Sequence, residues 1–363
     1  MYLLCPVKVP ERVVCGIAAG FWQECSAIDD DMPLQSSKLL KTLNRAATTR
    51  HESISREAFQ DAGLRVKVPV SSIKIGLKRP LPWLKVSDMV RTLALHNKLD
   101  KCLFGGLGFD GLKQFWCNYK RLWPEHPVFT KMGAEPSENT VFVPIYLHAD
   151  EGRHLKKEQI LIFNFQSVLG QGTSLSQDSG NRLDQCQGLN ILGSCYSTRF
   201  LITTLLSQHY RKKNKDGHRL NTVLKAITAD ILELYTNGVQ VSFHEKWVQL
   251  FVVPLGLKGD WPMLAKLGNL SRSFSRKGRP TENSCICHLC LAGAQNVPYH
   301  DHEIDAAWYD TYLQSRPWST PSPLMRLPTM PQPELFYCFD IFHVCHKGIY
   351  SELAASALVP LIN

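Results

Sequence analysis

The chain has 363 residues, of which 44% are hydrophobic and 20% charged. This composition is typical of a globular protein and excludes a disordered or collagen-like chain, and the length accommodates roughly two domains. The formal net charge of +9 favours a polyanionic partner such as DNA, although an excess of cations does not define a fold.

Twelve cysteines are present, and three of them are bunched between residues 285 and 290. A secreted disulfide scaffold would be shorter and its cysteines more regularly spaced. We therefore expect a reducing compartment, with most cysteines acting as small core residues. The sequence contains no run of 18 or more apolar residues, so we expect no membrane span.

Residues 1–130 are predicted to form a mainly helical N-terminal region of unknown role. Leucines recur at helical spacing within residues 36–63, and apolar residues again lie mostly on one face within residues 86–103. Between them, the stretch 78–82 contains two prolines and breaks any regular element.

The pattern changes at Thr140, where near-continuous apolar runs begin. Pro144 inside the first run predicts a bulge in that strand. Four strands are predicted, at residues 141–147, 159–165, 198–206 and 247–257, with an amphipathic helix at 219–237 before the last of them. This order suits a mixed sheet covered by helices, that is, an α/β fold.

Residues 265–335 are rich in Gly, Ser, Arg and Pro and are predicted to be an insertion outside the sheet. A last helix is expected from near Phe342 to the end. Its apolar residues 353–362 stop abruptly, which indicates a chain cut from a longer one.

Asp150 and Asp260 are the first candidates for catalysis, because each directly follows a predicted strand. Strand ends are where α/β sheets place ligands, and two carboxylates suit an oxygen-preferring Mg²⁺. If the first and fourth strands lie side by side, both carboxylates converge at one edge. Two ions about 3.5–4 Å apart can then activate a water or a 3′-hydroxyl at a phosphodiester. The alternative is a pair of ordinary acidic turns.

Cys287 and Cys290 have the Cys-x-x-Cys spacing that places two thiolates on one Zn²⁺. Zinc needs further ligands, and His343 and His346 on the last helix are the first choice. The alternative is a chance cluster of core thiols or a redox pair. Rival ligands are Cys285, His288, His300 and His302.

Glu352 is the only glutamate of the last helix, and it would have to approach the two aspartates to complete a metal site. Otherwise it is a solvated surface residue. Basic clusters are candidate phosphate contacts, or else simply solvated faces. The candidates for DNA contact are Arg153, Lys156, Arg272, Arg276, Lys277 and Arg279.

Two blocks of the sequence resemble those of a known family. The stretch from Leu257 to Ser271, followed by Lys277-Gly278 and then Cys287-x-x-Cys290, looks like the second-aspartate block of CACTA (En/Spm-type) transposases. The stretch from Phe339 to Leu353 looks like the Asp-x-Met-His-x-x-Lys-Asn block of that family, with Phe342 in place of Met and Gly348 in place of Asn. The likeness covers roughly residues 140–363.

This resemblance implies a ribonuclease-H-like DD(E/D) core at 131–363, with the insertion carrying a zinc knuckle. Asp150 and Asp260 would be the first and second ligands of catalytic Mg²⁺, and Cys287 and Cys290 would hold a structural Zn²⁺ with later histidines. DNA would be the partner, a homo-oligomer would handle two DNA ends, and the protein would be nuclear. In zinc-bearing relatives the third acid follows the histidine pair at a distance that here falls past Asn363. On that placement the resemblance implies a truncated chain without a complete acidic triad, which would be inactive as it stands.

The leading hypothesis is therefore metal-dependent phosphodiester hydrolysis and strand transfer, with no small-molecule substrate. The alternative is a non-catalytic, zinc-containing DNA-binding or chromatin-associated protein derived from a transposable element. A third reading is a ribonuclease-H-like nuclease that cuts without joining ends.

Overall fold

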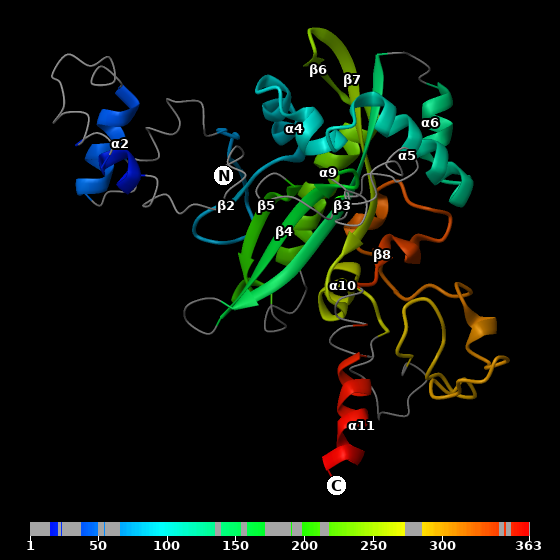
Figure 1. Cartoon of the computed structure of the whole chain (residues 1–363). Helices are drawn as coiled ribbons and strands as arrows, with labels where there is room; N and C mark the ends of the chain where they lie inside the picture. Colours follow the sequence, from blue (N-terminus) through cyan, green and yellow to red (C-terminus); the bar gives the residue numbers. More distant parts are fainter. Residues whose placement is uncertain are drawn as a thin grey trace.

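The protein is a mixed α/β structure built around a six-stranded sheet (Figure 1). A computed structural model describes residues 15–20, 23, 38–49, 54, 66–134, 139–153, 158–170, 190, 198–210, 218–272, 285–340, 345 and 350–362. None of the helices it describes is long and apolar enough to cross a membrane.

The main sheet has the strand order β5-β4-β3-β7-β6, with β8 also paired to β7. Strands β3, β4 and β5 form an antiparallel meander, whereas β7 runs parallel to β3 and β8 runs parallel to β7. The strands are β3 (Thr140–Arg153), β4 (Gln159–Ser167), β5 (Phe200–Leu206), β6 (Val239–Phe243), β7 (Lys246–Lys258) and β8 (Tyr337–Cys338). The four predicted strands are confirmed, and β6 and β8 are additional.

Residues 141–147 of β3 and 250–257 of β7 are almost all apolar, because helices pack on both faces of the sheet in the first part of this strand pair. The bulge expected at Pro144 falls one residue later, between Ile145 and Tyr146. There the register skips Leu255 of β7, directly after Pro254. Two prolines that lack an N–H therefore meet at the one irregular point of this strand pair.

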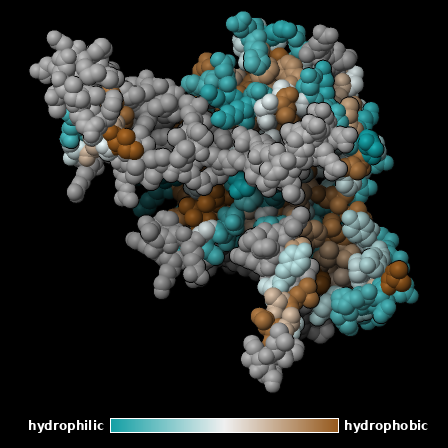
Figure 2. Space-filling view, in the orientation of Figure 1, coloured by the Kyte–Doolittle hydropathy of each residue, from teal (hydrophilic) through white to brown (hydrophobic). Residues whose placement is uncertain are grey.

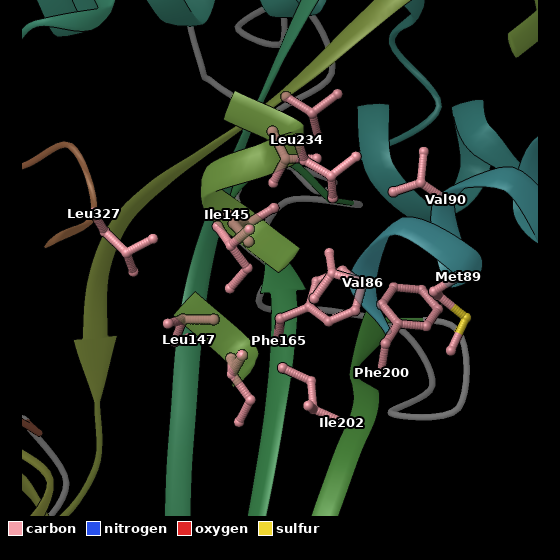
Figure 3. Close-up of a cluster of buried hydrophobic side chains, with 14 of the residues drawn as sticks. Val86, Met89, Val90, Ile145, Leu147, Phe165, Phe200, Ile202, Leu234 and Leu327 are labelled. Atoms are coloured by element: carbon pink, nitrogen blue, oxygen red, sulfur yellow. The ribbon is translucent and has the colours of Figure 1, made fainter. Parts of the chain in front are cut away.

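One face of the sheet packs against helix α9 (His218–Thr236) and helix α4 (Val86–Leu95). Figure 3 shows Ile145, Leu147 and Phe165 of the sheet meeting side chains from these helices. Helices α5 (Gly108–Leu122) and α6 (Val128–Ala134) cover the first half of the opposite face. Trp116 of α5 donates its indole N–H to the carbonyl of Phe142 at 2.9 Å.

Residues 66–134 share the core of the sheet, so the boundary expected near residue 130 does not mark a break in that core. Ser87 donates its hydroxyl to Asp230 of α9 at 2.5 Å. A two-stranded hairpin (β1, Ser71–Ile73; β2, Leu81–Trp83) and a short π-helix, η2 (Asp100–Phe104), belong to this region. In a separate small cluster, Leu43 and Ala46 of helix α2 (Lys38–Thr49) pack with Cys15 and Ala18.

Residues 265–335 were predicted to lie outside the main fold as an insertion, but both ends of this range belong to that fold. Its first residues end helix α10 (Trp261–Gly268), and its last form the short helices η7 (Pro323–Arg326) and η8 (Pro333–Phe336). Between these lie turns and the one-turn helix η6 (Tyr309–Thr311). Leu324 and Leu327 return to the main core, and η8 leads directly into β8.

The last helix, α11 (Tyr350–Ile362), points away from the sheet (Figure 1), and its Tyr350, Leu353 and Leu358 are exposed. The start expected near Phe342 lies outside the described residues.

Candidate functional site

The parallel pairing of β3 with β7 ends at His148 and Lys258, although β3 itself continues to Arg153. Asp150 therefore lies inside its strand, because β3 is longer than predicted, and only Asp260 follows a strand. His148 of β3 is the register partner of Lys258 of β7, and Asp150 and Asp260 each lie two residues further along. The two strands therefore lie next to each other, as the prediction of converging carboxylates required. Lys258 in turn pairs with Cys338 of β8, so Asp340 follows a third parallel strand at the same end of the sheet. We call this end the carboxylate edge.

The two aspartates differ in their surroundings. Asp150 is exposed, and its Oδ1 accepts the backbone N–H of Glu151 at 2.7 Å. Asp260 is half-buried and is the N-cap of α10, where its Oδ1 accepts the backbone N–H of Met263 at 2.8 Å. Capping is an ordinary structural role for Asp, and it uses only one carboxylate oxygen.

Two basic side chains that were not among the predicted site residues, His148 and Lys258, lie on the same strands. His148 is half-buried beside Asn164 of β4, with 3.2 Å between its Nδ1 and the amide nitrogen. Burial lowers the pKa of His148, and the nearby Asp150 carboxylate opposes that shift. The ammonium of Lys258 lies 4.5 Å from the ring centre of Tyr146, and burial lowers its pKa too. His148 precedes Asp150 by two residues within β3, a spacing that returns to the same face of the sheet. Lys258 is the last residue of β7 and precedes Asp260 by two residues in the chain.

Helix α10 is fastened to β3 from the other side of the sheet. Glu151 accepts hydrogen bonds from the Tyr210 hydroxyl at 2.6 Å and from the ammonium of Lys266, which lies on α10. Because Asp260 begins α10, this ion pair helps to set where the second aspartate lies relative to the first.

Residues 285–292 form what we call the Cys loop. Cys287 Sγ accepts the backbone N–H of Leu289 at 3.4 Å and also that of Cys290, while Cys290 Sγ accepts the N–H of Ala292. A hydrogen bond between the two sulfurs lowers the pKa of Cys287 to about 6 and raises that of Cys290. Adjacent sulfurs surrounded by N–H donors are suited to hold a thiolate-binding cation such as Zn²⁺.

Of the other predicted zinc ligands, Cys285 and His288 belong to the Cys loop itself and are buried, whereas no described contact joins the histidines outside the loop to it. His343 and His346 lie outside the described residues, and His300 and His302 are exposed. His288 is completely buried, and its Nε2 lies 3.1 Å from the carbonyl oxygen of Tyr337. Within the residues that the structure describes, no group of three or more His, Cys, Asp or Glu side chains is placed to hold a metal ion.

Arg272 is buried, which does not fit the phosphate contact predicted for it. Its guanidinium donates to the carbonyl of Cys290 at 3.1 Å, to the hydroxyl of Ser315 and to the carbonyl of Arg316. The residue therefore anchors the Cys loop. Of the other predicted phosphate contacts, Arg153 ends β3 but its side chain is not described, and the remaining ones lie outside the described residues: Lys156, Arg276, Lys277 and Arg279. Glu352, the predicted third acid, lies in α11, and its side chain is not described either.

No protein-family model matches this chain, and no curated protein matches it either. Fold and site together define a mixed α/β protein with one aspartate in β3, another just after the adjacent parallel strand β7, and a cysteine loop that contacts the residue after the second aspartate.

Proposed function

We propose that this chain is a DNA transposase-like protein of the CACTA type, carrying out metal-dependent phosphodiester hydrolysis and strand transfer. The observation that carries the proposal is the parallel pairing of β3 with β7, which brings Asp150 and Asp260 to one edge from distant parts of the sequence. Parallel strand ends are the usual place for ligands in such sheets.

The strand order supports a ribonuclease-H-like core. An antiparallel meander of three strands is followed by helix α9, then by β7 parallel to the first strand, then by α10 and by β8 parallel to β7. The β3-β4-β5 meander, the central β3 and the flanking parallel strands are the arrangement expected of that fold, to which β6 adds a hairpin.

The carboxylate edge fits Mg²⁺ in its donor chemistry. Mg²⁺ binds through one or two carboxylates and keeps several waters, so two aspartates need no further protein ligand to hold it. Each aspartate has one oxygen in a backbone hydrogen bond, which leaves the second for a cation. When bound, the metal would activate a water or 3′-hydroxyl and neutralise charge on the phosphodiester. Glu352 remains the proposed third acid.

The protein's own groups would bring DNA to this edge. Lys258 places a cationic group next to the two carboxylates, where it would attract a phosphate, and the neutral imidazole of His148 beside it would offer a hydrogen bond. The net charge of +9 acts in the same direction at longer range. Two DNA ends call for two protomers, so the proposal includes a homo-oligomer. A DNA partner also implies a nuclear location, which is part of the proposal.

The Cys loop fits a structural Zn²⁺. Cys287 and Cys290 would supply two sulfur ligands whose charge the loop's N–H groups stabilise, and His343 and His346 would complete the site. The proposed metal would hold the loop together without taking part in the cleavage of DNA.

Cleavage of DNA in the presence of Mg²⁺ or Mn²⁺ tests the enzymatic proposal. Asp150→Asn and Asp260→Asn are suitable variants, because asparagine also caps helices and the fold of α10 is preserved. Each should lower the cleavage rate by roughly a hundredfold or more, as expected when a charge that acts on the transition state is removed. Asp110→Asn, on the exposed surface of α5, is the matched control and should leave the rate unchanged. Cleavage that survives both edge variants would refute the proposal.

The capping bond of Asp260 favours a second candidate, a non-catalytic DNA-binding protein descended from such an element. In that case the aspartate is retained for the helix, and the Cys loop and basic residues are retained for DNA. The same experiment separates the two candidates, because the second predicts salt-dependent DNA binding with no metal-dependent cleavage.

A further inference from the structure

A cluster of three rings joins the Cys loop to the carboxylate edge. His288 lies with its ring centre 4.7 Å from that of Trp261 and 4.9 Å from that of Phe339. Trp261 and Phe339 are themselves stacked at 5.1 Å with an interplanar angle of 14°. We call these three residues the aromatic bridge.

The three rings come from residues next to the two candidate sites in the sequence. His288 stands between Cys287 and Cys290 of the loop, whereas Trp261 directly follows Asp260. Phe339 directly precedes Asp340 at the end of β8. One ring therefore belongs to the candidate zinc site, and the other two are neighbours of acidic residues at the carboxylate edge.

The contact is also firmly anchored. The imidazole is completely buried and bonded to the Tyr337 carbonyl, so it has a fixed orientation. Arg272 holds the same loop through the carbonyl of Cys290. Close-packed interiors do not absorb displacements freely, so a shift of the loop must move the rings that rest on it.

We propose that His288 is a positioning residue that transmits metal binding at the Cys loop to the first turn of α10, and so to Asp260. This inference rests on the zinc-binding part of the proposed function. A cation that draws Cys287 and Cys290 together fixes the residue between them, and its ring then holds Trp261 and the N-terminus of α10. Without the cation the loop is held by hydrogen bonds alone, and α10 opens more often at its first turn.

Hydrogen exchange of the full chain, followed by mass spectrometry, tests the coupling. The peptide of interest covers 260–268, where the N–H of Met263 bonds to the Asp260 carboxylate. Zn²⁺ added back to chelator-treated protein should slow exchange in this peptide about fivefold, the lower range of typical coupling between sites. In His288→Ala the effect of Zn²⁺ on this peptide should vanish, although chelator competition still detects Zn²⁺ bound to the cysteines.

Two further variants separate positioning from general stability. His288→Phe keeps a ring against Trp261 and should retain the zinc effect, which a loss of packing alone would not explain. His96→Ala alters an exposed histidine that was never a candidate zinc ligand and should behave as the unaltered protein. If His288→Ala does not fold, Phe339→Ala decides the matter: Phe339 is 41% exposed, so its loss is tolerated, and the zinc effect should fall by at least half.

A zinc effect that persists in His288→Ala or in Phe339→Ala would overturn the proposal. So would zinc that binds the unaltered chain without slowing exchange in this peptide. Failure of zinc to bind at all would remove both the zinc site and this inference. The cleavage assay with the aspartate variants would still judge the catalytic part of the proposed function separately.

Discussion

The two halves of the parallel pair β3 and β7 are built from the same strands but are packed differently. In the first half, Phe142 and Phe251 are buried and stacked, with ring centres 5.0 Å apart. Trp116 bonds to the backbone there, and the ammonium of Lys131 lies 4.3 Å from the centre of the Phe251 ring. Helices α5 and α6 thus enclose this half on the face that carries the two phenylalanines.

The second half of the same face is more open and more polar. His148 and Lys258 are half-buried, Asp150 is exposed, and on the neighbouring strands Ile162 and Leu201 are each 38% exposed. One face of the same sheet is therefore divided along its strands into a packed part and a charged, accessible part. On this face the enclosed half buries its aromatic side chains, and the open half carries the charged groups that we assign to DNA chemistry.

The largest effect expected from this comparison is on the enclosed half. Phe251→Ala should lower the free energy of unfolding by about 4 kcal/mol, because it removes a buried aromatic ring and leaves a cavity. Urea denaturation measures this loss. Ile162→Ala in the open half is the control and should cost about 1 kcal/mol or less, since part of that side chain is already in water. Equal losses at the two positions would show that the halves are not differently packed.

A pH dependence of stability should come from the helices that cover the enclosed half. His126, between α5 and α6, is 2% exposed, and its Nδ1 accepts the N–H of Val128 at 3.2 Å. Burial lowers the pKa of His126 from 6.5 to about 4. Between these values the unfolded chain binds more protons than the folded one, so stability falls as the pH drops from 6.5 towards 4. The full loss is at most about 3 kcal/mol, at roughly 1.4 kcal/mol per pKa unit.

Urea denaturation at pH 7 and pH 4 of the unaltered protein and of His126→Gln measures this contribution. Glutamine keeps an acceptor for the Val128 N–H but does not titrate, so the variant should lose less stability on acidification. The same loss in both proteins would mean that His126 is not the group responsible.

The outline of the sheet could be predicted from the sequence because long apolar runs identify buried strands without knowledge of their partners. The sequence does not predict that β3 pairs with β7, because an apolar run does not specify which strand lies beside it. The convergence of the two aspartates could therefore be predicted only for the case that these strands are neighbours. Strand β8 has two residues and its pairing is set by β7, so no periodicity signals it.

Some features of the candidate site could have been predicted from local sequence patterns. Asp260 followed by Trp-Pro is an N-cap with proline in the first turn, which predicts the start of α10. His148 could have been found from its two-residue spacing to Asp150 along the same strand. The burial of Arg272 could not, because its partners Ser315 and Arg316 come from a distant turn that only the fold brings close.

The smallest effect expected concerns the ion pair that fastens α10 to the open half. Lys266→Met keeps most of the side-chain volume but removes the ammonium from Glu151, whose side chain is only 15% exposed. Glu151 keeps its bond from Tyr210, and Lys266 is itself 36% exposed, so solvent already screens the pair. The free energy of unfolding should therefore fall by only about 1 kcal/mol.

The matched control for that variant is Lys113→Met on α5, where lysine and aspartate are both largely exposed and the change should stay within about 0.5 kcal/mol. A double-mutant cycle with Glu151→Gln isolates the energy of the pair itself. Because Lys266 acts on the position of Asp260 more than on the fold, the variant should lower metal-dependent DNA cleavage by more than its stability loss accounts for. A stability loss as large as that of Phe251→Ala would place this ion pair among the main supports of the fold and would remove the contrast between the two halves.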